Sequence, residues 1–356
     1  MRYPALIVNR EKVLSNARSV AELCRSRGID AWGVTKGLSG NPRLAEIYED
    51  AGFRGICDSR LRNLRHIEDA GSPLPRQLMR IAMMSELREL AVSAEMSLQS
   101  DIGTIKVLDR ICVSAGISHE VLIMIDVGDL REGFWPTELP DAARELKDLE
   151  GGVKIGGVAA NFACASGVLP TPDNMARLVE CRDLISEITG GEMPTVSVGG
   201  TCCLKLIEAG LAPEGVNVLR ICEGVLLGTD TAFDRVIPYL AGDAVTVTAE
   251  IVECRQKPSV PVGDVGYQAF GEKPVFTDRG LRKRAILAIG RQDVNIDRIT
   301  PLDRDVEIVT ASSDHLIVDV TEAGAVYRAG DLMSFRPLYP AMLACATSEY
   351  VEVIFE

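Results

Sequence analysis

The chain has 356 residues, 47% of them hydrophobic and 25% charged, which suffices for a large core and about two domains. Its apolar runs are too short to cross a bilayer. The net charge of −13 at pH 7 argues against a nucleic-acid partner, which needs concentrated Lys and Arg, and is compatible with a cationic substrate. The ten cysteines show neither a CxxC pair nor a metal-type grouping with the three histidines. We therefore expect reduced thiols, no metal site, and, without a signal-peptide pattern, a cytoplasmic protein with no membrane partner.

Short apolar runs alternate with amphipathic stretches from Ile29 to about Gly228, as expected of repeated βα units. Asn41-Pro42 predicts the start of a helix, since Asn caps helices and Pro suits their first turn. Eight βα units with buried strands predict an α/β fold, namely a closed (β/α)8 barrel of the TIM type. The predicted strands are Ala31–Lys36, Arg54–Asp58, Leu78–Ile81, Met96–Ser100, Glu120–Asp126, Lys154–Ala160, Thr195–Val198 and Asn217–Ile221.

After Pro238 the sequence changes to alternating Thr, Val and Glu with Gly/Pro-rich connections, which predicts a mainly β C-terminal domain. The opening run Ala5–Val8 belongs to no βα unit, so we expect it to pair with this domain. The predicted barrel covers residues 9–235, and the β domain covers 1–8 and 236–356. Its predicted strands include Ala244–Val252, Val306–Thr310, Leu316–Val320 and Val351–Phe355.

Lys36 ends the first predicted barrel strand, where catalytic groups of parallel barrels stand. Trp32, Val34 and Lys36 share one face by period-two counting, so the amine is expected to project inward from the barrel mouth. An amine shielded from water there is a competent nucleophile toward an aldehyde. A surface lysine at a strand end is the alternative.

Gly199-Gly200-Thr201 follows the seventh strand and precedes a predicted helix, Cys202–Ala209. Backbone amides and a hydroxyl at a helix start form a phosphate seat, and barrels often bind phosphate near strands seven and eight. An ordinary turn with a helix cap is the alternative.

Arg220 ends the eighth strand, and Arg131 lies just past the fifth. A guanidinium at a barrel mouth is suited to orienting an anionic or aromatic-nitrogen ligand. Ion pairs with Asp126 or Glu223 are the structural alternative for these two arginines.

Several motifs resemble the fold-type III enzymes that use pyridoxal phosphate (PLP), and most closely the alanine racemase family with its ornithine racemase branch. The resemblance covers nearly the whole chain, and the joint order of the motifs is more specific than any one of them. They are Val34-Thr35-Lys36-Gly37, Asp126-x-Gly128-x-x-Arg131-x-Gly133-Phe134, Asn161-Phe162-Ala163, Leu219-Arg220, Asp264–Gly271, Ala288–Val294 and Ser312–Val320.

The resemblance implies that Lys36 carries PLP through its aldehyde and acts as one catalytic base. It implies that Tyr267, from the partner subunit of a homodimer, is the second base, and that Asp314 lies beside the substrate. Residues implied to contact the cofactor are Arg220 at the pyridine nitrogen, Arg131 at the phenolic oxygen, Asn161, and Gly200, Thr201 and Tyr350 at the phosphate.

Two positions depart from the alanine racemases that the chain resembles. Met124 stands where many of them have a lysine that supports the arginine matching Arg131, and methionine forms no carbamate. Asn161 stands where they usually have a histidine linked toward the catalytic tyrosine. How Tyr267 is made basic is therefore not given by the resemblance.

The expected function is two-base racemisation of an amino acid, and the expected substrate is a diamino acid such as ornithine or lysine. An alanine or broad-specificity racemase is an alternative. A PLP-dependent decarboxylase of basic amino acids is a second one, which Arg220 disfavours and Glu223 keeps open. A non-catalytic PLP-binding protein is a third, which the long C-terminal domain disfavours.

Overall fold

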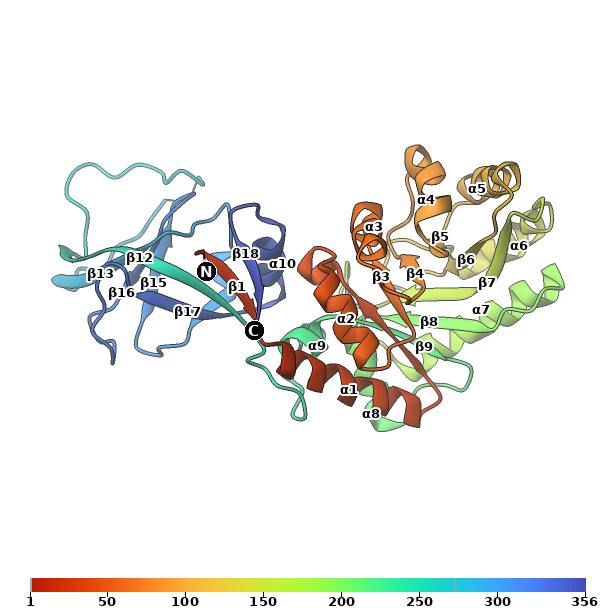
Figure 1. The fold of residues 1–356 in the computed structure, drawn as a ribbon, viewed down its shortest axis with the longest axis horizontal. Helices are drawn as coiled ribbons and strands as arrows, with labels where there is room; N and C mark the ends of the chain where they lie inside the picture. Colours follow the sequence, from red (N-terminus) through yellow and green to blue (C-terminus); the bar gives the residue numbers. More distant parts are fainter. Residues whose placement is uncertain (1, 272) are drawn as a thin grey trace. The chain divides into compact units, whose positions relative to one another are not determined.

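A computed structural model of the chain describes residues 2–271 and 273–356. The chain divides into two compact units, Glu11–Gly242 and Met1–Arg10 with Asp243–Glu356. The boundaries predicted from the sequence fall after residues 8 and 235. Figure 1 shows the first unit in red to green and the second mainly in blue. Every helix among the described residues is too short or too polar to span a lipid bilayer.

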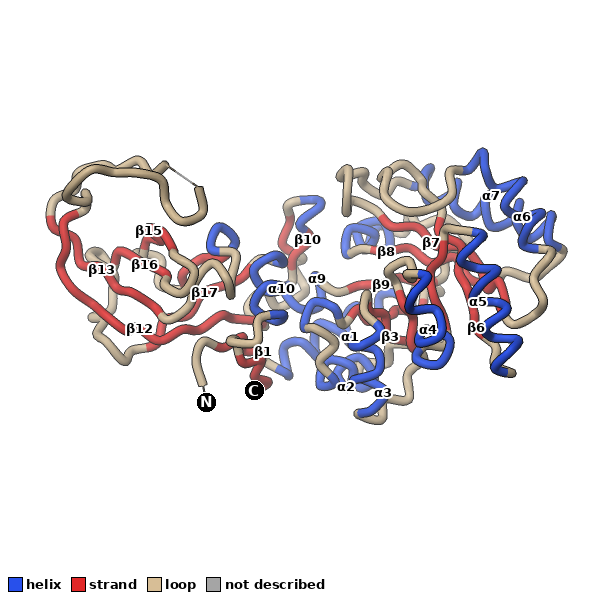
Figure 2. Tube along the Cα trace, turned by 90° about the horizontal axis from the view of Figure 1, so that it is seen from above, coloured by secondary structure: helices blue, strands red, loops and turns tan. Residues whose placement is uncertain are grey.

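The first unit is a closed barrel of eight parallel strands in sequential order, as predicted. β2 pairs with both β3 and β9, which closes the ring. Figure 2 shows strands inside and helices outside in this unit. The strands are β2 Asp30–Val34, β3 Gly55–Asp58, β4 Arg76–Leu78, β5 Met96–Gln99, β6 His119–Met124, β7 Val153–Asn161, β8 Thr195–Gly199 and β9 Val218–Ile221.

Helices follow the barrel strands with the expected start signals. Asn41 caps α2 by accepting from the Arg43 N–H at 3.0 Å, with Pro42 in the first turn. The helices are α1 Arg10–Ser26, α2 Pro42–Asp50, α3 Leu61–Asp69, α4 Leu87–Ser93, α5 Ile102–Ala115, α6 Leu139–Leu146, α7 Pro172–Thr189, α8 Leu204–Ala209 and α9 Glu223–Leu227. A short hairpin, β10 Thr229–Asp230 and β11 Arg235–Val236, follows α9.

Several sequence-based limits are wrong in detail, among them the following three in the barrel. β2 ends at Val34 rather than Lys36, because the Thr35 hydroxyl bonds to Asp58 at 2.7 Å and the chain then turns into a 3-10 helix, Lys36–Leu38. β4 covers Arg76–Leu78 rather than Leu78–Ile81. The helix predicted from Cys202 begins as a 3-10 turn, Thr201–Cys203, before α8.

The second unit is mainly antiparallel β, as predicted. β1 pairs antiparallel with β12 and parallel with β18, which confirms that the N-terminal run joins this unit. Figure 1 shows β1 beside β18. The remaining order is β14-β17-β12-β13-β16-β15. Its elements are β1 Ala5–Val8, β12 Val245–Pro258, β13 Leu281–Leu287, β14 Ile299–Pro301, β15 Glu307–Ala311, β16 Leu316–Asp319, β17 Leu332–Pro337, α10 Tyr339–Thr347 and β18 Glu352–Phe355.

Candidate active site

The predicted site residues of the barrel gather at the carboxyl ends of five strands that are consecutive around the ring. Parallel strands end at one face, so residues that follow β6, β7, β8, β9 and β2 share one sector of the mouth. These residues are Arg131 after β6, Asn161 ending β7, Gly200 and Thr201 after β8, Arg220 in β9 and Lys36 after β2. The structure therefore brings together the predicted barrel half of the site.

Lys36 lies in the first turn beyond β2 and is half-buried. Its charge acts on the nearby Cys222 thiol. Burial raises the pKa of Cys222 to about 12, and the charge of Lys36 acts to lower that pKa. Below it, Thr35 is fully buried and donates its hydroxyl to Asp58. Asp58 also accepts from the Asn63 side chain at 2.9 Å, so the turn that presents Lys36 is fixed from beneath.

Arg220 is 1% exposed and lies inside the barrel. Its Nη1 donates to Ser197 Oγ at 2.5 Å and its Nη2 donates to the Ala160 carbonyl at 2.8 Å. Its Nε–H has no acceptor among the described residues. Burial lowers the pKa of the guanidinium, and the thiols of Cys57 and Cys203 act in the opposite direction. The ion pair with Glu223 is absent: Glu223 instead accepts from the hydroxyls of Thr229 and Thr231.

Gly200 and Thr201 form the turn after β8. Gly200 has a φ of +106°, a backbone conformation that side chains rarely adopt. Thr201 is buried, and its hydroxyl accepts from the Gly224 N–H at 3.0 Å, which joins this turn to the start of α9. The hydroxyl predicted for phosphate binding therefore already has one partner, while its own hydrogen is available as a donor.

Arg131 does not pair with Asp126, whose carboxylate accepts from the backbone N–H groups of Gly128 and Leu130. Its guanidinium donates through Nε and Nη2 to both carboxylate oxygens of Glu132. Asn161, with its amide oxygen facing the donors, accepts from Arg131 Nη1 at 3.2 Å. Sequence reasoning missed Glu132, because neighbouring residues do not face each other in a regular strand or helix. The one feature of the sequence that could have revealed Glu132 is its position next to Arg131.

Asp129 is a second residue that the sequence did not reveal. It is buried, and its carboxylate accepts from four backbone N–H groups of the β7–α7 loop, those of Cys164, Ala165, Ser166 and Val168, at 2.9–3.2 Å. It thereby ties this loop to the loop that carries Arg131. Burial raises its pKa, but the four N–H groups outweigh burial, so the pKa lies below its usual value.

The other predicted residues belong to the second unit, and two of them, Asp314 and Tyr350, are joined to the turn after β13. Asp314 accepts from the Gln292 amide at 2.6 Å and from the Ser313 hydroxyl at 2.6 Å. Tyr350, 68% exposed, donates its backbone N–H to Ser348, whose hydroxyl bonds to Asp293 of the same turn. Tyr267 is 76% exposed in the β12–β13 connection.

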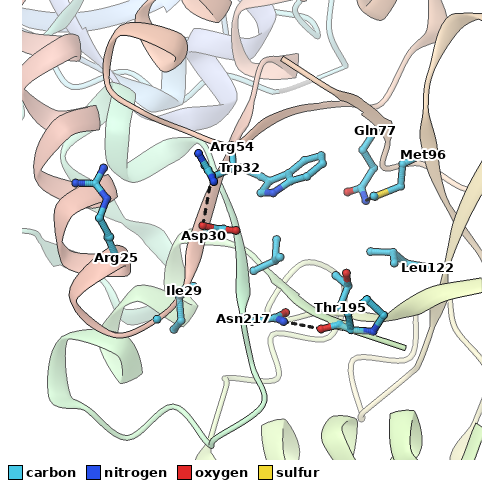
Figure 3. Close-up of a pocket in the computed structure, with 13 residues that line it drawn as sticks. Arg25, Ile29, Asp30, Trp32, Arg54, Gln77, Met96, Leu122, Thr195 and Asn217 are labelled. Atoms are coloured by element: carbon cyan, nitrogen blue, oxygen red, sulfur yellow. Dashed lines mark hydrogen bonds and ion pairs between the residues drawn. The ribbon is translucent and has the colours of Figure 1, made fainter. Parts of the chain in front are cut away.

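A cavity of about 650 Å³ opens at the opposite, amino-terminal face of the barrel. Figure 3 shows its lining, with Trp32, Gln77 and Met96 on the inner side and the Asp30–Arg54 ion pair at the edge. Asp30, Met96 and Thr195 are the first residues of their strands. Since barrel enzymes use the carboxyl ends of their strands, this cavity is not the candidate active site.

Comparison with known proteins agrees with the motifs. Residues 8–221 match the family model described as alanine racemase, N-terminal domain. The chain belongs to the alanine racemase family. It is 39% identical to a lysine racemase of Thermotoga maritima over 100% of this chain and 99% of that protein. It is 37% identical to an ornithine racemase of Acetoanaerobium sticklandii, covering 98% of this chain and 99% of that protein.

The fold comparison gives the same result. A crystal structure of alanine racemase from Bartonella henselae with covalently bound pyridoxal phosphate matches with a TM-score of 0.73 and 16% identity, over 99% of each chain. At this identity the likeness shows the fold, and it extends over the barrel and the β unit alike. The predicted alanine racemase-like architecture is confirmed.

Proposed function

We propose that this protein is a PLP-dependent racemase that interconverts the L and D forms of a diamino acid, lysine or ornithine. The observation that carries the proposal is full-length identity of 37–39% to a lysine racemase and an ornithine racemase. The acidic chain, with a net charge of −13, suits a substrate with an additional amine.

The barrel residues fit PLP by the chemistry they offer. The buried Nε–H of Arg220 has no acceptor among the described residues, and a buried donor without a partner is costly, so an acceptor such as the PLP ring nitrogen suits that place. Lys36 supplies the amine for the aldehyde, and Gly200 and Thr201 supply the turn for the phosphate. Asn161 and Arg131 would stand at the phenolic oxygen, and Tyr350 would complete the phosphate site.

Bound PLP withdraws electrons from the substrate Cα and so makes its proton removable. The chain's task is then to take that proton from one face and return one on the other, which needs two positioned groups. We assign Lys36 Nζ and Tyr267 Oη to these roles. Arg220, positively charged, would hold the ring nitrogen without giving it a proton, which would restrain side reactions of the cofactor.

Tyr267 and the β unit support a shared site. Tyr267 is three-quarters exposed, as expected of a side chain that acts on another subunit. We infer a homodimer in which each site joins Lys36 of one chain to Tyr267 of the other, with Asp314 beside the substrate. Gln292 and Ser313 hold both oxygens of Asp314, so its carboxylate is a candidate partner for a substrate amine. All ten cysteines are free thiols, which favours the reducing cytoplasm.

Other functions have weaker support. A PLP-dependent decarboxylase of basic amino acids is expected to pair the PLP ring nitrogen with an acid. Here Arg220 is the buried group, and Glu223 accepts hydrogen bonds from two threonines. A non-catalytic PLP-binding protein would resemble the barrel alone, whereas both racemase relatives match over 98–100% of the chain. An alanine or broad-specificity racemase differs only in substrate.

The test is a panel of L-lysine, L-ornithine, L-arginine and L-alanine, with each product analysed by chiral chromatography. We expect D-lysine or D-ornithine to form fastest and carbon dioxide to be absent. Fastest formation of D-alanine would overturn the substrate proposal, and release of carbon dioxide would overturn the reaction.

The cofactor assignment has its own test. Borohydride reduction of the PLP-loaded protein, followed by peptide mass analysis, should fix the cofactor to Lys36. Lys36→Ala should retain no label, whereas the control Lys205→Ala should be labelled like the native protein. A label on another lysine would remove Lys36 from its assigned role.

A further inference from the structure

The guanidinium of Arg131 is held on three of its nitrogens by two neighbours. Glu132 takes Nε and Nη2 in a two-point ion pair, and Asn161 accepts from Nη1 at 3.2 Å. Asn161 is itself fixed, since the same amide oxygen accepts from the Phe162 N–H at 3.2 Å. Paired bonds of this kind set the plane of a guanidinium as well as its position.

Met124 gives Arg131 no polar support. Met124 is 1% exposed in the apolar interior of the barrel with Leu98, Leu122 and Ala159. It offers no hydrogen bond to Arg131, so the polar support of the arginine comes from Glu132 and Asn161.

The charge of Glu132 acts on two arginines. Burial lowers the pKa of Arg131, but the hydrogen bonds and charge of Glu132 outweigh burial, so that pKa lies above its usual value. The pKa of Arg220 is lowered mainly by burial. The charge of Arg131 lowers this pKa further, and the charge of Glu132 raises it. Two like charges at one barrel mouth repel each other, and the carboxylate of Glu132 offsets the charge of Arg131, to which it is bonded.

We propose that Glu132 is a positioning residue that fixes the plane of Arg131 and offsets its positive charge at the cofactor site. The inference rests on the proposed function for the role of Arg131, but the contact itself is testable without cofactor. Loss of the carboxylate frees Arg131 to turn and leaves the cofactor site more positive.

The first experiment measures the reaction of Arg131 with phenylglyoxal in the cofactor-free protein by peptide mass. In Glu132→Gln, the rate at Arg131 should rise about tenfold, since two charge-assisted hydrogen bonds are lost. Glu132→Asp keeps the charge and should stay near the native rate. Asp183→Asn is the matched control: Arg182 and Asp183 are also adjacent and ion-paired at 2.5 Å, outside the site, and their loss should leave Arg131 unchanged. An unchanged rate at Arg131 in Glu132→Gln overturns the proposal.

The second experiment uses the PLP-loaded enzyme. Glu132→Gln should lower kcat by at least about tenfold, with KM changed less, while borohydride still fixes PLP to Lys36 and the unfolding midpoint in urea stays near native. Glu132→Asp should recover part of kcat. Loss of PLP and of stability together, without recovery by Asp, would reduce Glu132 to a structural role and overturn the proposal. If even the native protein fails to bind PLP or to racemise, the proposed function falls, whereas the phenylglyoxal rates still decide the contact.

Discussion

Gly199 and Arg220 are register partners on β8 and β9, and a Cβ on Gly199 would lie 2.4 Å from Nη2 of Arg220. The guanidinium thus occupies the space that the missing side chain leaves. Arg220 cannot move aside cheaply, because it is fully buried and bonded at both Nη atoms to Ser197 and Ala160.

Gly199→Ala should therefore displace Arg220, lower the free energy of unfolding by about 1–3 kcal/mol and weaken PLP binding. Urea unfolding and a PLP titration measure the two effects. Gly191→Ala is the control, since a Cβ there would meet only Thr189 Oγ1, at 3.7 Å. Native PLP affinity in Gly199→Ala would show that the position of Arg220 does not matter to the cofactor.

Asp129→Asn should loosen the β7–α7 loop. One amide oxygen cannot replace a carboxylate that accepts four N–H bonds, and the loss should cost about 1–3 kcal/mol locally. Hydrogen exchange should then accelerate at the amides of Cys164, Ala165, Ser166 and Val168. Because the pKa of Asp129 is lowered by folding, its contribution is present above the ordinary carboxylate pKa and fades as pH falls toward acid. Native exchange at these amides would refute the anchoring role.

His119 should make stability depend on pH. Burial lowers its pKa from 6.5 to about 4, so the unfolded chain takes up a proton that the folded chain resists. Its contribution to stability is complete above pH 6.5 and is lost as pH falls toward about 4, by roughly 3 kcal/mol at most. His119→Gln should flatten the dependence of the unfolding free energy on pH in this range. Replacement of the exposed His66 by Gln is the control and should leave this dependence unchanged. If the unfolding free energy of His119→Gln changed with pH as steeply as that of the native protein, the assignment would be contradicted.

The barrel could be predicted because its signals are local: strand-length apolar runs, amphipathic helices and a cap at Asn41. The end of β2 could not, because it is set by a hydrogen bond from Thr35 to Asp58, which lies on the next strand. The motifs predicted Lys36, Arg131 and Arg220 as site residues, and the barrel brings these three residues to one mouth. The partners of Arg220 were beyond the sequence, since Ser197 and Ala160 approach it only once the ring closes.

Shared active sites predict complementation between inactive subunits. Lys36→Ala and Tyr267→Phe homodimers should each be nearly inactive. When the two are unfolded and refolded as a mixture, about half of the dimers pair randomly as heterodimers, each with one intact site. Activity should recover to about a quarter of the native value. Heterodimers detected by mass without recovered activity would place both residues in one chain's site or exclude Tyr267 from catalysis.

The most direct measurement of the central claim follows the α-proton of L-lysine and L-ornithine in heavy water. A two-base racemase takes that proton and returns one from groups that exchange with solvent. The D-product should therefore carry deuterium at Cα and retain its carboxyl group. Chiral chromatography followed by mass spectrometry measures both. Lys36→Ala should give neither exchange nor D-product. Formation of the D-isomer without deuterium, or loss of the carboxyl group, would contradict the account.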